Sequence, residues 1–161
     1  MRAIRSGFGA LFVSYLIALV LMVMPMPGAL DAYRPDWLSL VLLYWLIALP
    51  HRVSMGTLLV LGLCTDILLG STFGVHAVGL LVMGYIAARN FQRIRNFSML
   101  QQMVVIGVLI AIKRLVVFQI EQVLNDAEFV PQYLWPVFTS AIMWLWLFHL
   151  LRKVRRNFRI V

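Results

Sequence analysis

Apolar residues fill the chain in six long stretches that short polar connections separate. A helix needs about 20 apolar residues to cross a bilayer, and it satisfies its own backbone groups where water is absent. The pattern therefore predicts an all-α, polytopic integral membrane protein with six transmembrane helices in a single domain, 1–161. The expected helices cover residues 8–30, 36–50, 53–69, 75–90, 98–124 and 133–152.

Two turns between these stretches have clear local signals. Pro50, His51 and Arg52 mark a turn after the second stretch, because proline disfavours helix at the preceding residue. Gly70 and Gly74 supply turn chemistry after the third. The first stretch is longer than the ~7–15 apolar residues of a signal peptide, so we interpret it as an uncleaved helix, although the small residues of "PMPGALDA" leave cleavage open.

The charged residues are few and strongly asymmetric. They make up 12% of the chain, against about 25% in soluble domains. With six crossings, one side holds Arg2, Arg5, Arg52, Arg89, Arg93, Arg95, Arg152, Lys153, Arg155, Arg156 and Arg159, whereas the other holds Arg34 with Asp31, Asp36, Asp126 and Glu128. Basic loops stay in the cytoplasm, so both termini are expected there. This topology accounts for the net charge of +8, and no nucleic-acid partner is expected.

Four charged residues lie well inside predicted helices, where an ionised group is costly unless it is paired or hydrated. They are Asp66 in the third helix and Lys113, Arg114 and Glu121 in the fifth, where Arg114 and Glu121 share one helical face at i, i+7. We predict that Asp66, Arg114 and Glu121 form an intramembrane polar cluster in the outer half of the bundle. One interpretation is a buried salt bridge that fixes helix register. The other is a site for a ligand, an ion or a partner's polar side chain.

Catalytic chemistry is not predicted. His76 is expected to be an interfacial residue or a hydrogen-bonded helix end, and one Asp66–His76 pair is weak support for acid/base catalysis. Cys64 is the single cysteine, which excludes an intrachain disulfide and a multi-cysteine metal site. We therefore expect no enzyme activity, no catalytic residues, no metal site and no cofactor.

The segment from Arg34 to Leu80 resembles the rod shape-determining protein MreD family of Gram-negative bacteria. The similarity lies in "RPDW", "ALPHRV" and "GSTFGVHA", with "RKVRRNF" near the end of the chain. It covers essentially the whole chain and is looser between residues 98 and 132. The resemblance implies a non-enzymatic, multi-pass subunit in the bacterial inner membrane, within the elongasome, the machine that inserts peptidoglycan along the cell cylinder and so maintains rod shape.

The resemblance also implies partners and a fold. An MreC-like membrane-anchored protein is the expected direct partner in the lipid bilayer, with MreB, a RodA-type glycosyltransferase and a class B penicillin-binding protein in the wider complex. The family is similar in fold to the helical bundle of the S components of energy-coupling factor transporters, so the alternative function is small-molecule binding or transport. The residues that match the family are structural or partner-binding candidates: Arg34, Pro35, Asp36, Trp37, Pro50, His51, Arg52, Asp66, Gly70 and Gly74.

Overall fold

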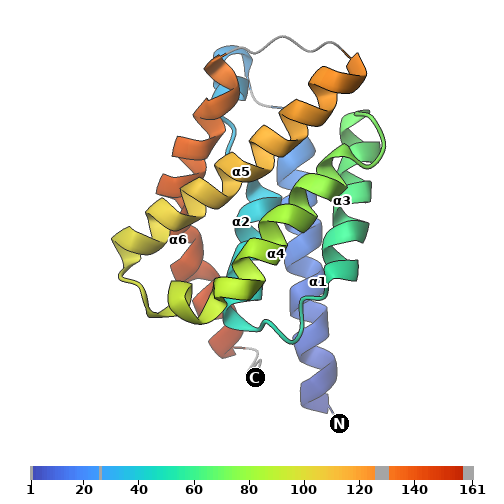
Figure 1. The fold of residues 1–161 in the computed structure, drawn as a ribbon. Helices are drawn as coiled ribbons and strands as arrows, with labels where there is room; N and C mark the ends of the chain where they lie inside the picture. Colours follow the sequence, from blue (N-terminus) through green and yellow to red (C-terminus); the bar gives the residue numbers. More distant parts are fainter. Residues whose placement is uncertain (1, 26, 126–130, 158–161) are drawn as a thin grey trace.

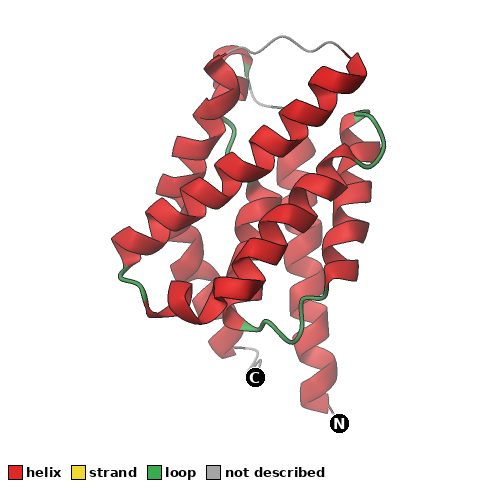
Figure 2. Ribbon diagram, viewed as in Figure 1, coloured by secondary structure: helices red, strands yellow, loops and turns green. Residues whose placement is uncertain are grey.

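The computed structural model describes residues 2–25, 27–125 and 131–157. In this part of the chain all regular structure is helical, and no strand occurs (Figure 2). The α-helices are α1 (Arg2–Val23), α2 (Trp37–Ala48), α3 (Met55–Leu69), α4 (Val75–Asn96), α5 (Met99–Asn125) and α6 (Trp135–Asn157), with short 3-10 helices η1 (Gly28–Tyr33) and η2 (Pro131–Leu134) (Figure 1). The prediction of an all-α chain with six helices is confirmed.

The short helix α2 forms the centre of the bundle. It contacts α1, α4, α5 and α6, and its side chains from Trp37 to Ile47 are all buried. Its 12 residues rise only about 18 Å, against a hydrocarbon core of about 30 Å. Helix α2 is therefore apolar on every side because other helices surround it.

The outer surface of the bundle is also apolar. Large exposed apolar side chains cover α1, α3, α5 and α6, among them Phe12, Val20, Val60, Val104 and Ile142. Soluble proteins rarely expose such extended apolar surface, so this is the exterior of a membrane protein. Within the described residues, the helices long and apolar enough to cross a bilayer are Met99–Leu124 and Pro131–Asn157, with shorter apolar helices at Gly9–Val23 and Met55–Leu69.

Three predicted helix ends were wrong. The first helix ends at Val23 and not at residue 30, since Pro25 and Pro27 follow and proline interrupts a helix. Helix α4 continues past residue 90 to Asn96, and α6 continues past residue 152 to Asn157. The basic side chains in these last turns favour helix, because they face the negative end of the helix dipole.

Helices α3 and α4 pack closely against each other. A Cβ atom on Gly62 would lie 2.3 Å from the Cα of Ala77, so only glycine fits there. Gly70 and Gly74 have φ values of 63° and 95°, in the left-handed region that glycine tolerates best. The turn predicted between these two helices is confirmed.

The bundle has two ends of opposite character. The start of α1 and the end of α6 lie at one end, together with the α4–α5 turn, whereas η1, η2 and the α3–α4 turn lie at the other (Figure 1). We call these the basic end, with Arg95 and Arg155, and the acidic end, with Asp31 and Glu121. The predicted positions of Arg2, Arg5, Asp126, Glu128 and Arg159 fall outside the described side chains.

Candidate functional site

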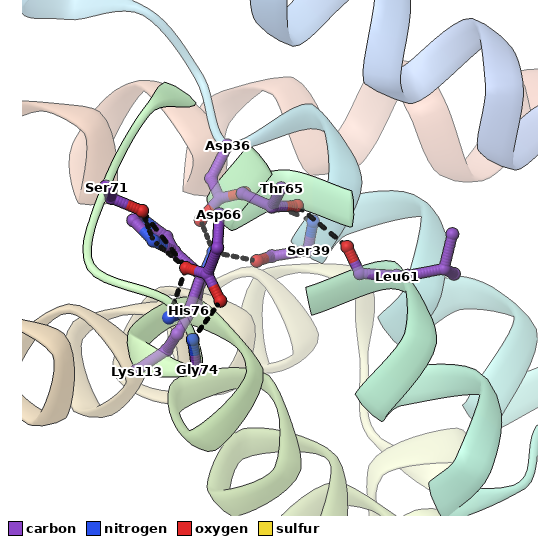
Figure 3. A network of polar contacts seen from close by, with 9 residues as sticks. All are labelled: Asp36, Ser39, Leu61, Thr65, Asp66, Ser71, Gly74, His76 and Lys113. Atoms are coloured by element: carbon purple, nitrogen blue, oxygen red, sulfur yellow. Dashed lines mark hydrogen bonds and ion pairs between the residues drawn. The ribbon is translucent and has the colours of Figure 1, made fainter. Parts of the chain in front are cut away.

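A buried ion pair joins α2 to α5 at the acidic end. Lys113 Nζ lies 2.6 Å from Asp36 Oδ2 and donates to Ser39 Oγ at 2.9 Å. Asp36 is also the N-cap of α2, where its other carboxylate oxygen accepts from Ser39 N at 3.2 Å. Its own N–H donates to Ser140 Oγ of α6 at 2.8 Å. Asp36 therefore connects α2 with α5 and α6. Figure 3 shows its contact with Lys113.

A second polar group organises the α3–α4 turn around Asp66. Its carboxylate accepts from Gly74 N at 2.8 Å and from His76 N at 2.9 Å. It also lies 3.1 Å from the Ser71 hydroxyl and 2.9 Å from His76 Nδ1 (Figure 3). Asp66 thus satisfies N–H groups at the start of α4 that have no partner within that helix. His76 is a hydrogen-bonded helix end, as expected.

The partners of Asp66 differ from those that the sequence suggested. We predicted a cluster with Arg114 and Glu121, but the contacts of Asp66 come from its own turn, within ten residues along the chain. Arg114 instead donates to Tyr133 O at 2.9 Å, and its guanidinium lies 5.0 Å from the Tyr133 ring centroid. The pairing of Asp66 with Arg114 and Glu121 is therefore wrong, because the turn supplies nearer donors.

Arg34 closes the end of α1. Its Nη2 donates to Met24 O at 2.8 Å and to Asp31 Oδ1 at 2.5 Å, and its Nη1 donates to Met22 O. The last carbonyls of a helix have no partner within the helix. Arg34 donates to these carbonyls in place of the backbone N–H groups of a further helical turn, which Pro25 prevents.

A cavity of about 420 Å³ lies at the acidic end, and we call it the acidic-end cavity. Its charged and titratable lining residues are Asp31, Arg34, Asp36, His76, Lys113, Arg114, Glu121 and Tyr133, and Asp66 is not among them. The two arginines each keep a buried Nε–H without a hydrogen-bond partner. The volume matches a small ligand or a few side chains, and the balanced charges suit a polar or zwitterionic group.

The other candidates from the sequence lie at both ends of the bundle. Pro35 is buried and lines the acidic-end cavity, and Trp37 is buried beside it in α2. Pro50, His51 and Arg52 form the α2–α3 turn at the basic end. The structure therefore separates this turn from the cavity by the whole length of α2.

Sequence reasoning missed the contribution of Lys113, Ser39 and Ser140. Lys113 had a usable signal, because a lysine inside an apolar helix needs a partner. Its partner is Asp36, which we had counted among the charges of the outer side, at the first residue of the second predicted helix. Ser39 and Ser140 carry no such signal, since small hydroxyl residues are common in packed helices.

The arrangement contains ion pairs and helix caps, and it lacks metal-ligand geometry. In residues 2–25, 27–125 and 131–157, no group of three or more His, Cys, Asp or Glu side chains could hold a metal ion. The polar side chains are mostly engaged with each other, so the site is suited to holding helices, or a bound polar group, in place.

An all-helical bundle with an apolar exterior and a polar cavity at one end is the architecture of a helical membrane protein. The sequence model of the family described as rod shape-determining protein MreD matches residues 4–154. The rod shape-determining protein MreD of Haemophilus influenzae is 41% identical over 146 residues, which cover 91% of this chain and 90% of that protein. The chain therefore belongs to the MreD family of rod shape-determining proteins, and its role is in cell shape. No solved structure matches the chain.

Proposed function

We propose that the protein crosses the bacterial inner membrane six times as one domain, with both termini in the cytoplasm. The basic end carries Arg89, Arg93, Arg95 and Arg152, and all described acidic residues lie toward the other end. This asymmetry follows the positive-inside rule. The short helix α2 crosses inside the protein, where the surrounding helices and not lipid cover it.

In this membrane the protein acts as a non-enzymatic subunit of the elongasome. It binds an MreC-like membrane-anchored protein directly and supports peptidoglycan synthesis along the cell cylinder, next to MreB, a RodA-type glycosyltransferase and a class B penicillin-binding protein. The observation that carries this proposal is the acidic-end cavity, which opens on the outer side under the proposed topology. Its unpartnered Arg34 and Arg114 Nε–H groups would donate hydrogen bonds to carbonyl or carboxylate oxygens of the partner.

The test is co-purification of the MreC-like protein with variants of the cavity. Glu121→Gln and Arg114→Gln remove one charge each with little change of shape, and Arg89→Gln at the basic end is the matched control. We expect each cavity variant to recover less partner per unit of inserted protein, and the control to recover a normal amount. Unchanged recovery with both cavity variants would contradict the proposal.

The same cavity supports a second candidate function, binding or transport of a small molecule in the manner of an S component. About 420 Å³ is enough for such a ligand. Mass spectrometry of the purified protein distinguishes the two candidate functions. A retained small molecule that Glu121→Gln releases, with no protein partner, would favour the second candidate.

A further inference from the structure

A cleft at the basic end has the composition of a phosphate site. It holds about 230 Å³ and is lined by Tyr44, Ile47, Ala48, Arg95, Gln102, Trp144, Phe148, Arg152 and Arg155. The cleft forms because α2 ends at Ala48, whereas α6 continues to Asn157. The space beyond the C-terminal end of α2 is therefore not filled by that helix. Arg95 comes from the last turn of α4, and Arg152 and Arg155 come from the last two turns of α6. Both helices end at this end of the bundle (Figure 1).

The charge in this cleft has no counterpart within the described chain. Arg95, Arg152 and Arg155 form none of the ion pairs found in residues 2–25, 27–125 and 131–157. Every described carboxylate lies toward the acidic end of the bundle. Three arginines that share one cleft repel each other, so an anion between them lowers their free energy.

Two buried polar atoms beside the arginines also lack partners. Trp144 is fully buried, and its Nε1–H has no hydrogen-bond acceptor in the described structure. Gln102 is 5% exposed; its Nε2 donates to Phe97 O at 3.2 Å, which leaves Oε1 without a donor. A buried polar group without a partner is costly, and native proteins usually satisfy it. The cleft therefore offers one neutral donor and one acceptor in addition to its positive charge.

We propose that this cleft binds the phosphoglycerol headgroup of an anionic phospholipid, such as phosphatidylglycerol. The phosphate oxygens accept from the arginines, which match phosphate geometry, and from Trp144 Nε1. A glycerol hydroxyl donates to Gln102 Oε1. A carboxylate would satisfy the donors but has no hydrogen for Gln102. The inference does not depend on the proposed partner, because it concerns lipid at the other end of the bundle.

The aromatic side chains of the cleft fit this level of a membrane. Phe148 lies between Tyr44 and Trp144, with ring centroids at 5.6 Å and 5.9 Å. Aromatic rings are enriched where the headgroups meet the acyl chains. Together with Ile47 they form an apolar wall for the first carbons of the lipid, and basic pockets between helices at this level bind anionic headgroups.

The experiment compares two charge-matched double variants of the full-length protein. Arg95→Gln with Arg155→Gln removes two cleft arginines, and Arg93→Gln with Arg156→Gln removes two neighbours in the same helix turns that do not line the cleft. Each purified protein is titrated in detergent with phosphatidylglycerol or phosphatidylethanolamine, and bound lipid is counted by native mass spectrometry. We expect affinity for phosphatidylglycerol to fall at least about tenfold in the cleft variant and to change little in its control.

A third variant still tests the proposal if the cleft double variant does not fold. Trp144→Phe keeps the aromatic wall and removes only the N–H donor, so phosphatidylglycerol should bind about fivefold more weakly. Equal losses in both double variants would overturn the proposal in favour of diffuse attraction to the membrane. Equal binding of phosphatidylethanolamine, or no effect of Trp144→Phe, would also overturn it. Displacement of the lipid by inorganic phosphate would assign the cleft to a soluble phosphate.

Discussion

The ion pair between Lys113 and Asp36 gives the sharpest test of how the bundle is held together. Both side chains are almost fully buried, and their charged atoms lie 2.6 Å apart. Lys113→Met keeps much of the side-chain volume but leaves the Asp36 carboxylate buried without its cation. Removing one partner of a buried pair typically costs about 3–5 kcal/mol. We expect a loss of this size in the free energy of unfolding, which lowers the folded-to-unfolded ratio by roughly a thousandfold.

The double variant Asp36→Asn with Lys113→Met separates the pair from the packing around it. Asparagine caps a helix about as well as aspartate, so the first turn of α2 keeps its N-cap. With both charges removed, no unpaired charge is left between α2 and α5, and replacing a whole buried pair is often nearly neutral. We therefore expect the double variant to be more stable than Lys113→Met alone by at least about 2 kcal/mol.

The assay is unfolding of the purified protein in mixed micelles of mild detergent and increasing dodecyl sulfate, followed by the loss of helical circular dichroism. The two single variants and the double variant are compared with the unaltered protein in one thermodynamic cycle. Additive losses, in which the double variant is the least stable of all, would show that the two side chains do not stabilise the fold as a pair. So would a Lys113→Met protein as stable as the unaltered one.

Three further predictions test the turn, the helix packing and the topology. Gly62→Ala should force α3 from α4 and cost about 1–3 kcal/mol of stability, measured by thermal unfolding in detergent. Asp66→Asn should cost about 1–3 kcal/mol, because its amide cannot accept all the donors of the α3–α4 turn; loss of protein from the membrane fraction would report it. With Cys64 replaced by Ser, a membrane-impermeant thiol reagent should label Ala32→Cys in intact cells, and Asn157→Cys only after lysis.

The predictions for Gly62 and Asp66 each have a matched control variant. Gly56→Ala should be tolerated, because its Cβ would lie 3.5 Å from the Ser54 hydroxyl, an ordinary contact. Thr65→Ser next to Asp66 keeps its hydroxyl and should leave protein levels unchanged. Equal damage from both glycine variants, normal levels of Asp66→Asn, or labelling of Asn157→Cys in intact cells would each contradict the corresponding argument.

The apolar pattern was enough to predict the number and order of the helices, but not where all of them end. Hydropathy places residues 24–30 with the first helix, although Pro25 and Pro27 stop it at Val23 and Arg34 satisfies its last carbonyls. The same pattern stops the fourth helix at its arginines. Charged residues interrupt an apolar run but not a helix, so α4 continues to Asn96.

The candidate site was predictable in its residue types and not in its pairings. Asp66 stands out in the sequence as a charged residue in an apolar stretch, yet its partners come from a tight turn whose geometry depends on the left-handed Gly70 and Gly74. Lys113 lies next to Arg114 in sequence but about 100° away around the helix. Which of the two faces Asp36 depends on the rotation of α5, and packing against the other helices sets that rotation.

Site-specific photocrosslinking in living cells tests whether the acidic-end cavity receives a protein partner, as we propose. A photoreactive amino acid replaces Leu69, which lines the cavity and is 44% exposed, and Leu100 near the basic end serves as the control. We predict one dominant crosslink from position 69 to the MreC-like protein, and none from position 100. Rod-shaped cells that give no protein crosslink at position 69, or equal crosslinks at both positions, would contradict the account.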